Sequence, residues 1–352
     1  MDLFPLARPV LRHIDPERAH RLTILALKLG LAPRDDEPDP ASLAIDLWGL
    51  HFSNPLGIAA GFDKNGEVPD AMLKLGLGFA EVGTTTPRPQ SGNPRPRIFR
   101  LNGEGAVINR LGFNNEGHAA LKRRLDARRS KPGIVGVNIG ANKDAADRIA
   151  DYEAGIAAFE GLASYFTVNI SSPNTPGLRA LQNKAELENL VVRVLAAREG
   201  RTPVLLKIAP DLTDAELADI AEVALEKGLD GLIVSNTTIR REGLVSSPLA
   251  SETGGLSGRP LFSLSTEVLK TMYRLTGGKI PIVGVGGVSS GADAYAKIRA
   301  GASLVQLYTA LVFEGPALVR RIKRELAQAL AADGFGNIRD AVGVDVKNQE
   351  AT

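Results

Sequence analysis

Hydrophobic residues in most of the chain fall into short runs separated by longer amphipathic stretches. The runs cover residues 56–60, 79–83, 134–139, 166–170, 204–208, 231–235, 280–285 and 304–308. They are rich in Val, Ile and Leu and show no alternation with polar residues, which is typical of strands covered on both faces. The pattern therefore predicts eight buried parallel strands.

Helical periodicity occupies the intervals between these runs. The predicted helices cover residues 66–76, 115–129, 151–163, 184–199, 214–227, 263–275, 291–299 and 315–331. Strict alternation of eight strands with eight helices predicts an α/β fold, the (β/α)8 TIM barrel. A doubly wound sheet is the alternative, but eight units and the lack of an early Gly-x-Gly-x-x-Gly motif disfavour it. Leu43–Leu47 and His51–Ser53 predict a β-hairpin that plugs the bottom of the barrel.

The N-terminal segment has a different pattern, that of two amphipathic helices. The first carries the apolar residues Leu3, Leu6, Ala7, Val10, Leu11 and Ile14, and we expect Pro9 to break or kink it. The second begins at Asp15-Pro16-Glu17, a favourable N-cap sequence, and ends at Gly30. Its apolar residues are too spread for one core stripe, so the hairpin either packs on the barrel or rests in the headgroup layer of a membrane.

Three segments follow from these patterns. Residues 1–40 form the helical hairpin and most of a linker, since residues 32–42 are polar and rich in proline. Residues 41–343 form the barrel, and residues 344–352 form a tail that we expect to be frayed.

Composition narrows the possible functions. Of 352 residues, 44% are hydrophobic and 23% charged, and the net charge of +2 offers no basic field for nucleic acid. The absence of cysteine excludes disulfides, a thiol base and a Cys-ligated iron–sulfur cluster in this chain. The four histidines lack metal-ligand spacing, so we predict no metal. Without a long apolar run or a signal-peptide pattern, the protein is expected on the cytoplasmic side, with a peripheral membrane location left open.

Polar, small or cationic residues follow every predicted strand, at the end where such barrels carry their active sites. These strand-end segments are 59–65, 83–87, Asn138, Asn169 with the stretch to Arg179, 207–210, 235–238, 284–288 and 308–309. Because all eight ends meet on one face of a barrel, the pattern predicts a single active site there.

The chemistry of these residues divides into three groups. Gly286, Gly287, Tyr308 and Thr309 follow the last two strands, where barrels bind phosphate through backbone N–H groups. Two lysines at strand ends, Lys64 and Lys207, require an anion such as a carboxylate or a reduced flavin. Five asparagines supply paired donors and acceptors suited to a pyrimidine or an isoalloxazine ring. They are Asn109, Asn138, Asn169, Asn174 and Asn236.

The stretch Val168–Arg179 carries the candidate base. Pro173 and Pro176 prevent it from being helical, so it forms a polar loop after the fourth strand. No His, Asp, Glu or Cys stands where a base is needed, and the hydroxyl of Ser172 is the best placed proton acceptor. The alternative role for Ser172 is a simple hydrogen bond to the substrate.

Several motifs of the sequence match one family over nearly the whole chain. They are residues 60–64 (Ala-Gly-Phe-Asp-Lys), 108–113 (Ile-Asn-Arg-Leu-Gly-Phe), 168–179, 207–212, 254–260 and 284–287. On these motifs the chain resembles the class 2, quinone-dependent dihydroorotate dehydrogenases, flavin enzymes of pyrimidine biosynthesis. Serine at position 172 fits class 2, because the classes with a soluble acceptor have cysteine there.

The resemblance implies a cofactor and two binding sites. FMN would lie on Ala60, Gly61, Lys64, Thr84, Asn138, Asn169, Lys207, Ser235, Gly258, Gly287, Tyr308 and Thr309. Dihydroorotate would contact Lys64, Asn109, Arg110, Leu111, Gly112, Phe113, Asn169, Asn174, Asn236 and Thr237. Ser235 departs from the usual threonine but keeps the hydroxyl.

The same resemblance implies a mechanism and partners. Ser172 would remove the C5 proton of dihydroorotate while hydride passes from C6 to N5 of FMN, giving orotate. A membrane quinone, ubiquinone or menaquinone, would then take the electrons, with its head near His20 and Arg100. The hairpin would provide an apolar tunnel at the membrane surface, and no iron–sulfur partner subunit is expected.

Three alternatives remain at the level of sequence. The chain could be another FMN barrel, either a 2-hydroxy-acid oxidase or a pyrimidine reductase, or a non-catalytic phosphate-ligand binder at the membrane surface. Hydroxy-acid oxidases generally use a catalytic histidine, and no histidine follows a strand here. The Pro-Gly pattern of residues 175–183 also suits a lid over the substrate.

Overall fold

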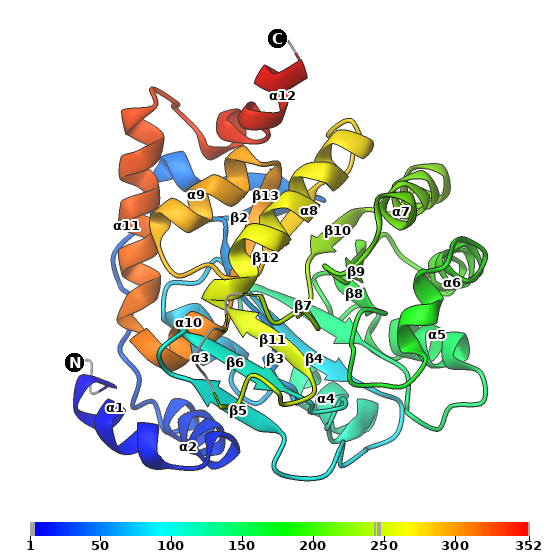
Figure 1. Cartoon of the computed structure of the whole chain (residues 1–352), viewed down its shortest axis with the longest axis horizontal. Coiled ribbons are helices and arrows are strands. Elements are labelled where there is room, and N and C mark those ends of the chain that lie inside the picture. Colours follow the sequence, from blue (N-terminus) through cyan, green and yellow to red (C-terminus); the bar gives the residue numbers. More distant parts are fainter. Residues whose placement is uncertain (1–3, 243, 245–247, 351–352) are drawn as a thin grey trace.

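Eight parallel strands close into a barrel in the computed structural model, which describes residues 4–242, 244 and 248–350 (Figure 1). Around the barrel the strands follow chain order, and the last pairs with the first. They are β3 (Leu56–Asp63), β4 (Phe79–Thr85), β7 (Ile134–Ile139), β8 (Phe166–Asn169), β9 (Val204–Ile208), β10 (Gly231–Val234), β12 (Ile282–Val285) and β13 (Ala302–Leu307). The predicted (β/α)8 barrel is confirmed.

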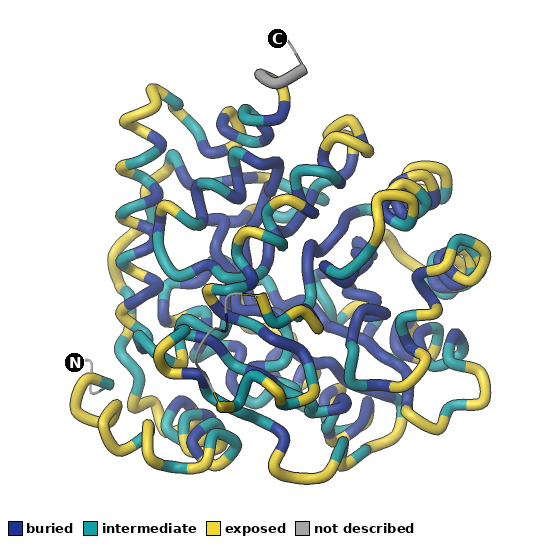
Figure 2. Tube along the Cα trace, in the orientation of Figure 1, coloured by how far each residue is buried: buried dark blue, intermediate teal, exposed yellow. Residues whose placement is uncertain are grey.

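Helices between the strands form the outer layer of the barrel (Figure 1). They are α3 (Pro69–Lys74), α4 (Gly117–Asp126), α5 (Arg148–Phe159), α6 (Lys184–Ala196), α7 (Asp214–Lys227), α8 (Phe262–Leu275), α9 (Gly291–Arg299) and α11 (Ala317–Ala332). Each overlaps a helix predicted from the sequence. The strands are almost entirely buried, whereas the outer faces of the helices are exposed (Figure 2). This contrast explains why the strands lack an alternating pattern.

A β-hairpin closes the amino-terminal end of the barrel, as predicted. It consists of β1 (Ile45–Leu47) and β2 (Leu50–Phe52). The ring of Phe52 packs edge-on against Phe79, with centroids 5.5 Å apart. Trp48 between the strands donates from Nε1 to the carbonyl of Asp230 at 2.7 Å, which ties the plug to the start of β10.

Three features were not predicted. The strands β5 (Ile98–Leu101), β6 (Ala106–Asn109) and β11 (Gly255–Gly258) form a separate antiparallel sheet, built from two loops after barrel strands. A short helix α10 (Thr309–Glu314) follows β13 directly. The expected frayed tail is wrong for residues 344–350, which form α12 (Val344–Glu350), because Val346 packs into the core and Asp345 pairs with Arg299.

The N-terminal hairpin consists of α1 (Phe4–His13) and α2 (Pro16–Lys28), which lie beside β5 and α10 (Figure 1). Pro9 lies inside α1, so the expected break at this residue is wrong. The side chain of Asp15 caps α2 by accepting from the amide of Arg18, as its sequence predicted. No residue of α1 is buried, and only Ala19, Ile24 and Leu27 of α2 are. The hairpin therefore contacts the barrel along one narrow face.

Polar contacts hold this hairpin on the β5 side of the molecule. Glu17 on α2 accepts from both Arg95 and Arg97, at 2.6 to 3.1 Å. The guanidinium of Arg97, with burial opposing it, holds the pKa of Glu17 at about 2. Arg100 on β5 donates to the backbone carbonyls of Leu11, Arg12 and Ile14 at the C-terminal end of α1. Cationic side chains are favoured at this end of a helix.

We expect the Glu17→Gln variant to loosen the hairpin while the barrel stays intact. The substitution removes the charge that both arginines share, so amide hydrogen exchange across residues 16–28 should accelerate. Because the folded pKa is depressed, the ion pair persists at pH 5 and is lost only as the pH falls toward 2. Hydrogen exchange followed by mass spectrometry at pH 5 and pH 7 measures the faster exchange of the variant. It also shows whether the wild-type hairpin is equally protected at the two pH values. Glu226→Gln on the exposed face of α7 is the control, and equal acceleration in both variants contradicts the docking role.

Candidate active site

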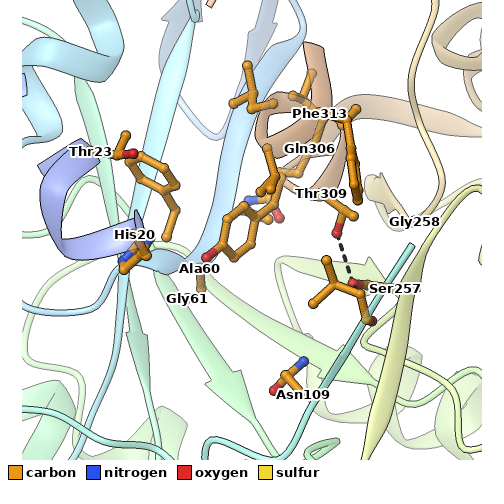
Figure 3. Close-up of a pocket in the computed structure, with 18 of the residues that line it drawn as sticks. His20, Thr23, Ala60, Gly61, Asn109, Ser257, Gly258, Gln306, Thr309 and Phe313 are labelled. Atoms are coloured by element: carbon orange, nitrogen blue, oxygen red, sulfur yellow. Dashed lines mark hydrogen bonds between the residues drawn. The ribbon is translucent and has the colours of Figure 1, made fainter. Parts of the chain in front are cut away.

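One cavity of about 590 Å³ runs from the carboxyl ends of the barrel strands to the N-terminal hairpin. Figure 3 shows His20 and Thr23 on one side of it and Asn109, Ser257 and Thr309 on the other. Most of the site residues predicted from sequence line it. They are Ala60, Gly61, Lys64, Thr84, Asn109, Leu111, Gly112, Phe113, Asn169, Ser172, Asn174, Lys207, Ser235, Asn236, Thr237, Gly258, Gly287, Tyr308 and Thr309, together with His20 and Arg100.

Two predicted residues, Asn138 and Arg110, do not line this cavity. Asn138 is fully buried behind the wall, where its Oδ1 accepts from Thr84 Oγ1 at 2.5 Å and from Asn169 Nδ2 at 3.2 Å. Arg110 forms an ion pair with Glu252 at 2.7 Å and lies over the ring of Phe99. Asn138 therefore supports the wall, whereas the Arg110 side chain fastens neighbouring loops.

The loop that carries Ser172 is held by a dense set of hydrogen bonds. Ser172 is 6% exposed, and its Oγ accepts from the amide of Asn174 at 3.3 Å. The Asn174 side chain in turn donates to Asn109 Oδ1 at 3.4 Å. Further along, Arg179 donates to the carbonyl of Ser171 at 3.0 Å and pairs with Asp211 at 2.9 Å. The candidate base thus sits on a fixed segment, although residues 175–183 remain a predicted lid.

The two lysines give the polar end of the cavity its charge. Within the described residues, neither Lys64 nor Lys207 forms a salt bridge, and the one hydrogen bond is from Lys64 Nζ to the carbonyl of Gly61 at 2.7 Å. Burial, only partly offset by Glu17, lowers the pKa of Lys64 to about 8. Burial likewise lowers the pKa of Lys207, and Glu81 opposes that shift. An anion bound here would supply the missing counter-charge.

Glycines form a close-packed corner next to the last two strands. Gly287 has a positive φ of 76°, and a Cβ there would lie 2.5 Å from the Cβ of Phe262, the first residue of α8. Across the corner, Thr309 Oγ1 donates to Ser257 Oγ at 2.8 Å (Figure 3). The glycine backbone at positions 258, 286 and 287 lines the cavity at this corner, where it can approach a bound anion closely, as a phosphate site requires.

The opposite end of the cavity is apolar and is walled by the hairpin. Apolar residues of both helices line it, namely Phe4, Ala7 and Leu11 of α1 and Leu22 and Ala26 of α2. His20 of α2 packs edge-on against Phe62 at 5.4 Å. Burial and the nearby Lys64 lower the pKa of His20 to about 3, so its imidazole is neutral. One cavity therefore combines a cationic inner end with an outer end whose walls are mainly apolar.

Two polar residues inside the barrel were missed from the sequence. Glu81 on β4 is fully buried, and Gln306 on β13 lines the cavity and donates to Glu81 at 2.7 Å. Their signal was available, because each is the polar residue in an otherwise apolar run, Phe79–Val82 and Leu304–Leu307. Such a residue in a strand covered on both faces is costly to bury without a partner.

Neither a metal cluster nor a membrane span is found in the described part of the chain. No group of three His, Asp or Glu side chains there could hold a metal ion. None of the helices over residues 4–242, 244 and 248–350 is long and apolar enough to cross a bilayer.

In (β/α)8 barrel enzymes the active site lies at the carboxyl ends of the strands. The closed parallel barrel and the charged pocket at those ends therefore place this chain in that class of protein. Residues 42–330 match the dihydroorotate dehydrogenase family. The chain is 78% identical to the quinone-dependent dihydroorotate dehydrogenase of Parvibaculum lavamentivorans, over 98% of this chain and 99% of that protein. The mitochondrial quinone-dependent enzyme of Oryza sativa is 52% identical, over 97% of this chain and 80% of that protein.

A solved structure of the same family has the same fold. The Eimeria tenella dihydroorotate dehydrogenase, determined in complex with ferulenol, is 43% identical with a TM-score of 0.91, covering 94% of this chain and 96% of that one. The chain belongs to the dihydroorotate dehydrogenase family, in its quinone-dependent class. Members of this family are flavin-dependent oxidoreductases. The assignment decides against the hydroxy-acid oxidase, the pyrimidine reductase and the non-catalytic binder.

We expect Gly287→Ala to destabilise the protein more than Gly277→Ala. Both glycines have positive φ, so each alanine should lower the free energy of unfolding by about 1–2 kcal/mol through backbone strain alone. Position 277 has open space around it, whereas a Cβ at 287 meets the backbone of Phe262 at 2.6 Å. Denaturant unfolding of both variants measures the difference. Equal losses contradict the close approach of this loop to α8.

Proposed function

We propose that this protein oxidises dihydroorotate to orotate with bound FMN and passes the electrons to a membrane quinone, as a step of pyrimidine biosynthesis. The observation that carries the proposal is the two-ended cavity, with two unpaired ammonium groups and Ser172 inside and an apolar mouth between two helices. A reaction between a small anionic substrate and an apolar electron acceptor needs both ends in one protein.

The residues at the inner end fit FMN. Gly258, Gly287, Tyr308 and Thr309 would hold its phosphate, since glycine backbone can approach an anion closely. The isoalloxazine ring of FMN would be lined by Ala60, Gly61, Thr84, Asn169 and Ser235, with Asn138 behind them. Lys207 would lie where the ring gains negative charge. When bound, FMN would supply the two-electron acceptor of the reaction.

The substrate would bind between the FMN site and the loops above it. Lys64 would pair with the carboxylate of dihydroorotate, which would also restore the ordinary pKa of this buried ammonium group. The side chains of Asn109, Asn174, Asn236 and Thr237 would bind the pyrimidine edges, with Leu111, Gly112 and Phe113 packing around them. Arg110 would act from outside the cavity through its ion pair with Glu252.

Ser172 would accept the C5 proton of the substrate. Its hydroxyl is buried in the cavity and would have to release its own proton to solvent as it takes the C5 proton. The positive charges of Lys64 and Lys207 in the same cavity lower the cost of the negative charge that Oγ carries during this exchange. Asn174 donates its backbone N–H to Oγ and so orients the free lone pair of the hydroxyl. The chain offers Ser172 no carboxylate or imidazole partner within the described part of this loop.

The hairpin of residues 1–40 would bind the quinone and rest on the cytoplasmic side of the cell membrane as a peripheral module. Four apolar side chains of the hairpin that do not line the cavity are 51–78% exposed, which suits the headgroup layer: Leu6, Val10, Leu25 and Leu29. His20 and Arg100 line the cavity where the head of a ubiquinone or menaquinone would reach it. The hydrogen bonds of Arg100 to α1 would couple this site to the position of the hairpin.

We expect Ser172→Ala to slow reduction of the bound flavin by dihydroorotate by about 10²- to 10⁴-fold, the usual contribution of a positioned base. Orotate binding should stay close to normal, because the loop keeps its other contacts. Anaerobic stopped-flow absorbance measures the rate. Ser171→Ala is the contrast, since Ser171 Oγ holds Asn169 and Asn236 and its loss should weaken binding first. An unchanged rate in Ser172→Ala contradicts the base assignment.

A second variant tests the apolar end. Ala26→Trp places an indole in the cavity between the helices and should strongly slow turnover with a long-tailed quinone, while leaving turnover with a small soluble dye intact. Arg21→Trp on the exposed side of α2 is the matched control. Steady-state assays with both acceptors measure the ratio. Equal loss on both acceptors contradicts the tunnel.

A further inference from the structure

The interior of the barrel contains one pair of opposite charges, of which the proposed mechanism uses only Lys207. Along the eight barrel strands the charged residues are Asp63, Glu81 and Lys207. Asp63 lies at the end of β3 and accepts from the amides of Glu67 and Val68. Glu81 and Lys207 lie inside the barrel, 0% and 5% exposed. A buried carboxylate is costly, so its surroundings should show what it does.

Three neutral donors surround the Glu81 carboxylate. Asn138 Nδ2 donates to Oε1 at 2.8 Å, and the Tyr165 hydroxyl and Gln306 Nε2 donate to Oε2 at 3.0 and 2.7 Å. Burial raises the pKa of Tyr165 well above its usual value, so the phenol stays protonated and remains a donor. These bonds solvate the carboxylate but leave its charge uncompensated.

An ionised carboxylate only accepts hydrogen bonds, so it decides how the neighbouring amides point. Asn138 must turn Nδ2 toward Glu81, which directs its Oδ1 to Thr84 and Asn169 on the cavity wall. Gln306 must likewise turn Nε2 inward, and its Oε1 is then left without a hydrogen-bond partner among the described residues. Gln306 lines the cavity, so this unpartnered oxygen lies in the layer directly behind the cavity surface.

Glu81 is also the charge that acts on Lys207. The neighbours of Lys207 in the sheet are Asn169 on β8 and Ile233 on β10, and neither strand contains a charged residue. Burial lowers the pKa of Lys207 and Glu81 raises it. The lysine at the other side of the site is different, because Glu17, Arg97 and Asp63 are the charges that act on Lys64.

We propose that Glu81 is a positioning residue for the cofactor site: its buried carboxylate sets the orientation of the Asn138 and Gln306 amides and is the negative charge that shares the barrel interior with Lys207. The inference rests on the proposed flavin site and extends it to a layer that does not line the cavity. Glu81 acts through Asn138, Gln306 and Lys207, and each of these three residues receives its orientation or its charge from the same carboxylate.

The pH dependence of FMN binding to cofactor-free protein tests the role of the charge. In the wild type, affinity should fall with rising pH as Lys64 and Lys207 lose their protons. Each deprotonation gives one step in the plot of FMN affinity against pH. Glu81→Gln should move the step that belongs to Lys207 to a lower pH by about one unit, the low end of what a nearby opposite charge contributes. The Lys64 step should stay in place and so serves as an internal reference. Fluorescence titration of FMN across neutral to alkaline pH measures both steps.

Tyr165→Phe is the matched control, because it removes one hydrogen bond from Glu81 and leaves the charge. Both steps should keep their wild-type pH in this variant, even if it melts at a lower temperature. If Glu81→Gln also keeps both steps at the wild-type pH, the proposal is overturned and Glu81 is only a structural residue.

Unfolding of the cofactor-free protein provides a second measurement that needs no ligand. Glu81→Gln leaves a buried ammonium without counter-charge, and Lys207→Met leaves a buried carboxylate without one. The double variant removes both charges, so it should melt at a higher temperature than the sum of the single effects predicts. If Glu81→Gln alone does not fold, the double variant should recover folding.

Additive effects on melting, or a double variant no more stable than Glu81→Gln, overturn the counter-charge role. A wild-type protein that binds no FMN at any pH contradicts the proposed function instead. In that case the coupling between Glu81 and Lys207 in unfolding still decides the role of Glu81.

Discussion

Closure of the parallel barrel is the constraint on which the rest of the structure depends. Every strand is covered by helices outside and by side chains inside, so each strand must be apolar along nearly its whole length. Polar groups are then confined to the strand ends, and parallel strands bring all their carboxyl ends to one face. The convergence of lysines, amides and hydroxyls from distant parts of the chain follows from this geometry. It creates a polar pocket without requiring any single motif.

Because the barrel is closed, charged side chains in its interior stand out as exceptions to this rule. A carboxylate and an ammonium group inside the barrel, Glu81 and Lys207, are the places where burial of charge is tolerated. The cost of burying the carboxylate is offset by hydrogen bonds from Asn138, Tyr165 and Gln306, and Glu81 opposes the effect of burial on the pKa of Lys207. The network joins the barrel interior to the wall of the site, so the core and the chemistry share residues.

The hairpin shows a second way in which the fold serves the site. It adds little to the core, since α1 has no buried residue, yet it forms the apolar end of the cavity together with residues of β5 and α10. Its position is set by polar contacts to β5 and to the loop before it, through Glu17 and Arg100. The linker after it is tied to α11 by Lys323, which pairs with Asp35 and Asp39. An element with so little buried surface depends on such contacts for its placement.

The sequence alone determined the barrel, its strands and the types of residue at their ends, because strand burial and loop chemistry are local properties that leave a pattern. It also pointed to Ser172 as the candidate base, since no His, Asp, Glu or Cys stands where a base is expected. Tertiary structure decided the rest. The bond between Gln306 and Glu81 joins residues 225 positions apart, and the antiparallel sheet of β5, β6 and β11 pairs two separate loops. Neither has a local periodicity, so both became visible only when closure of the barrel brought their parts together.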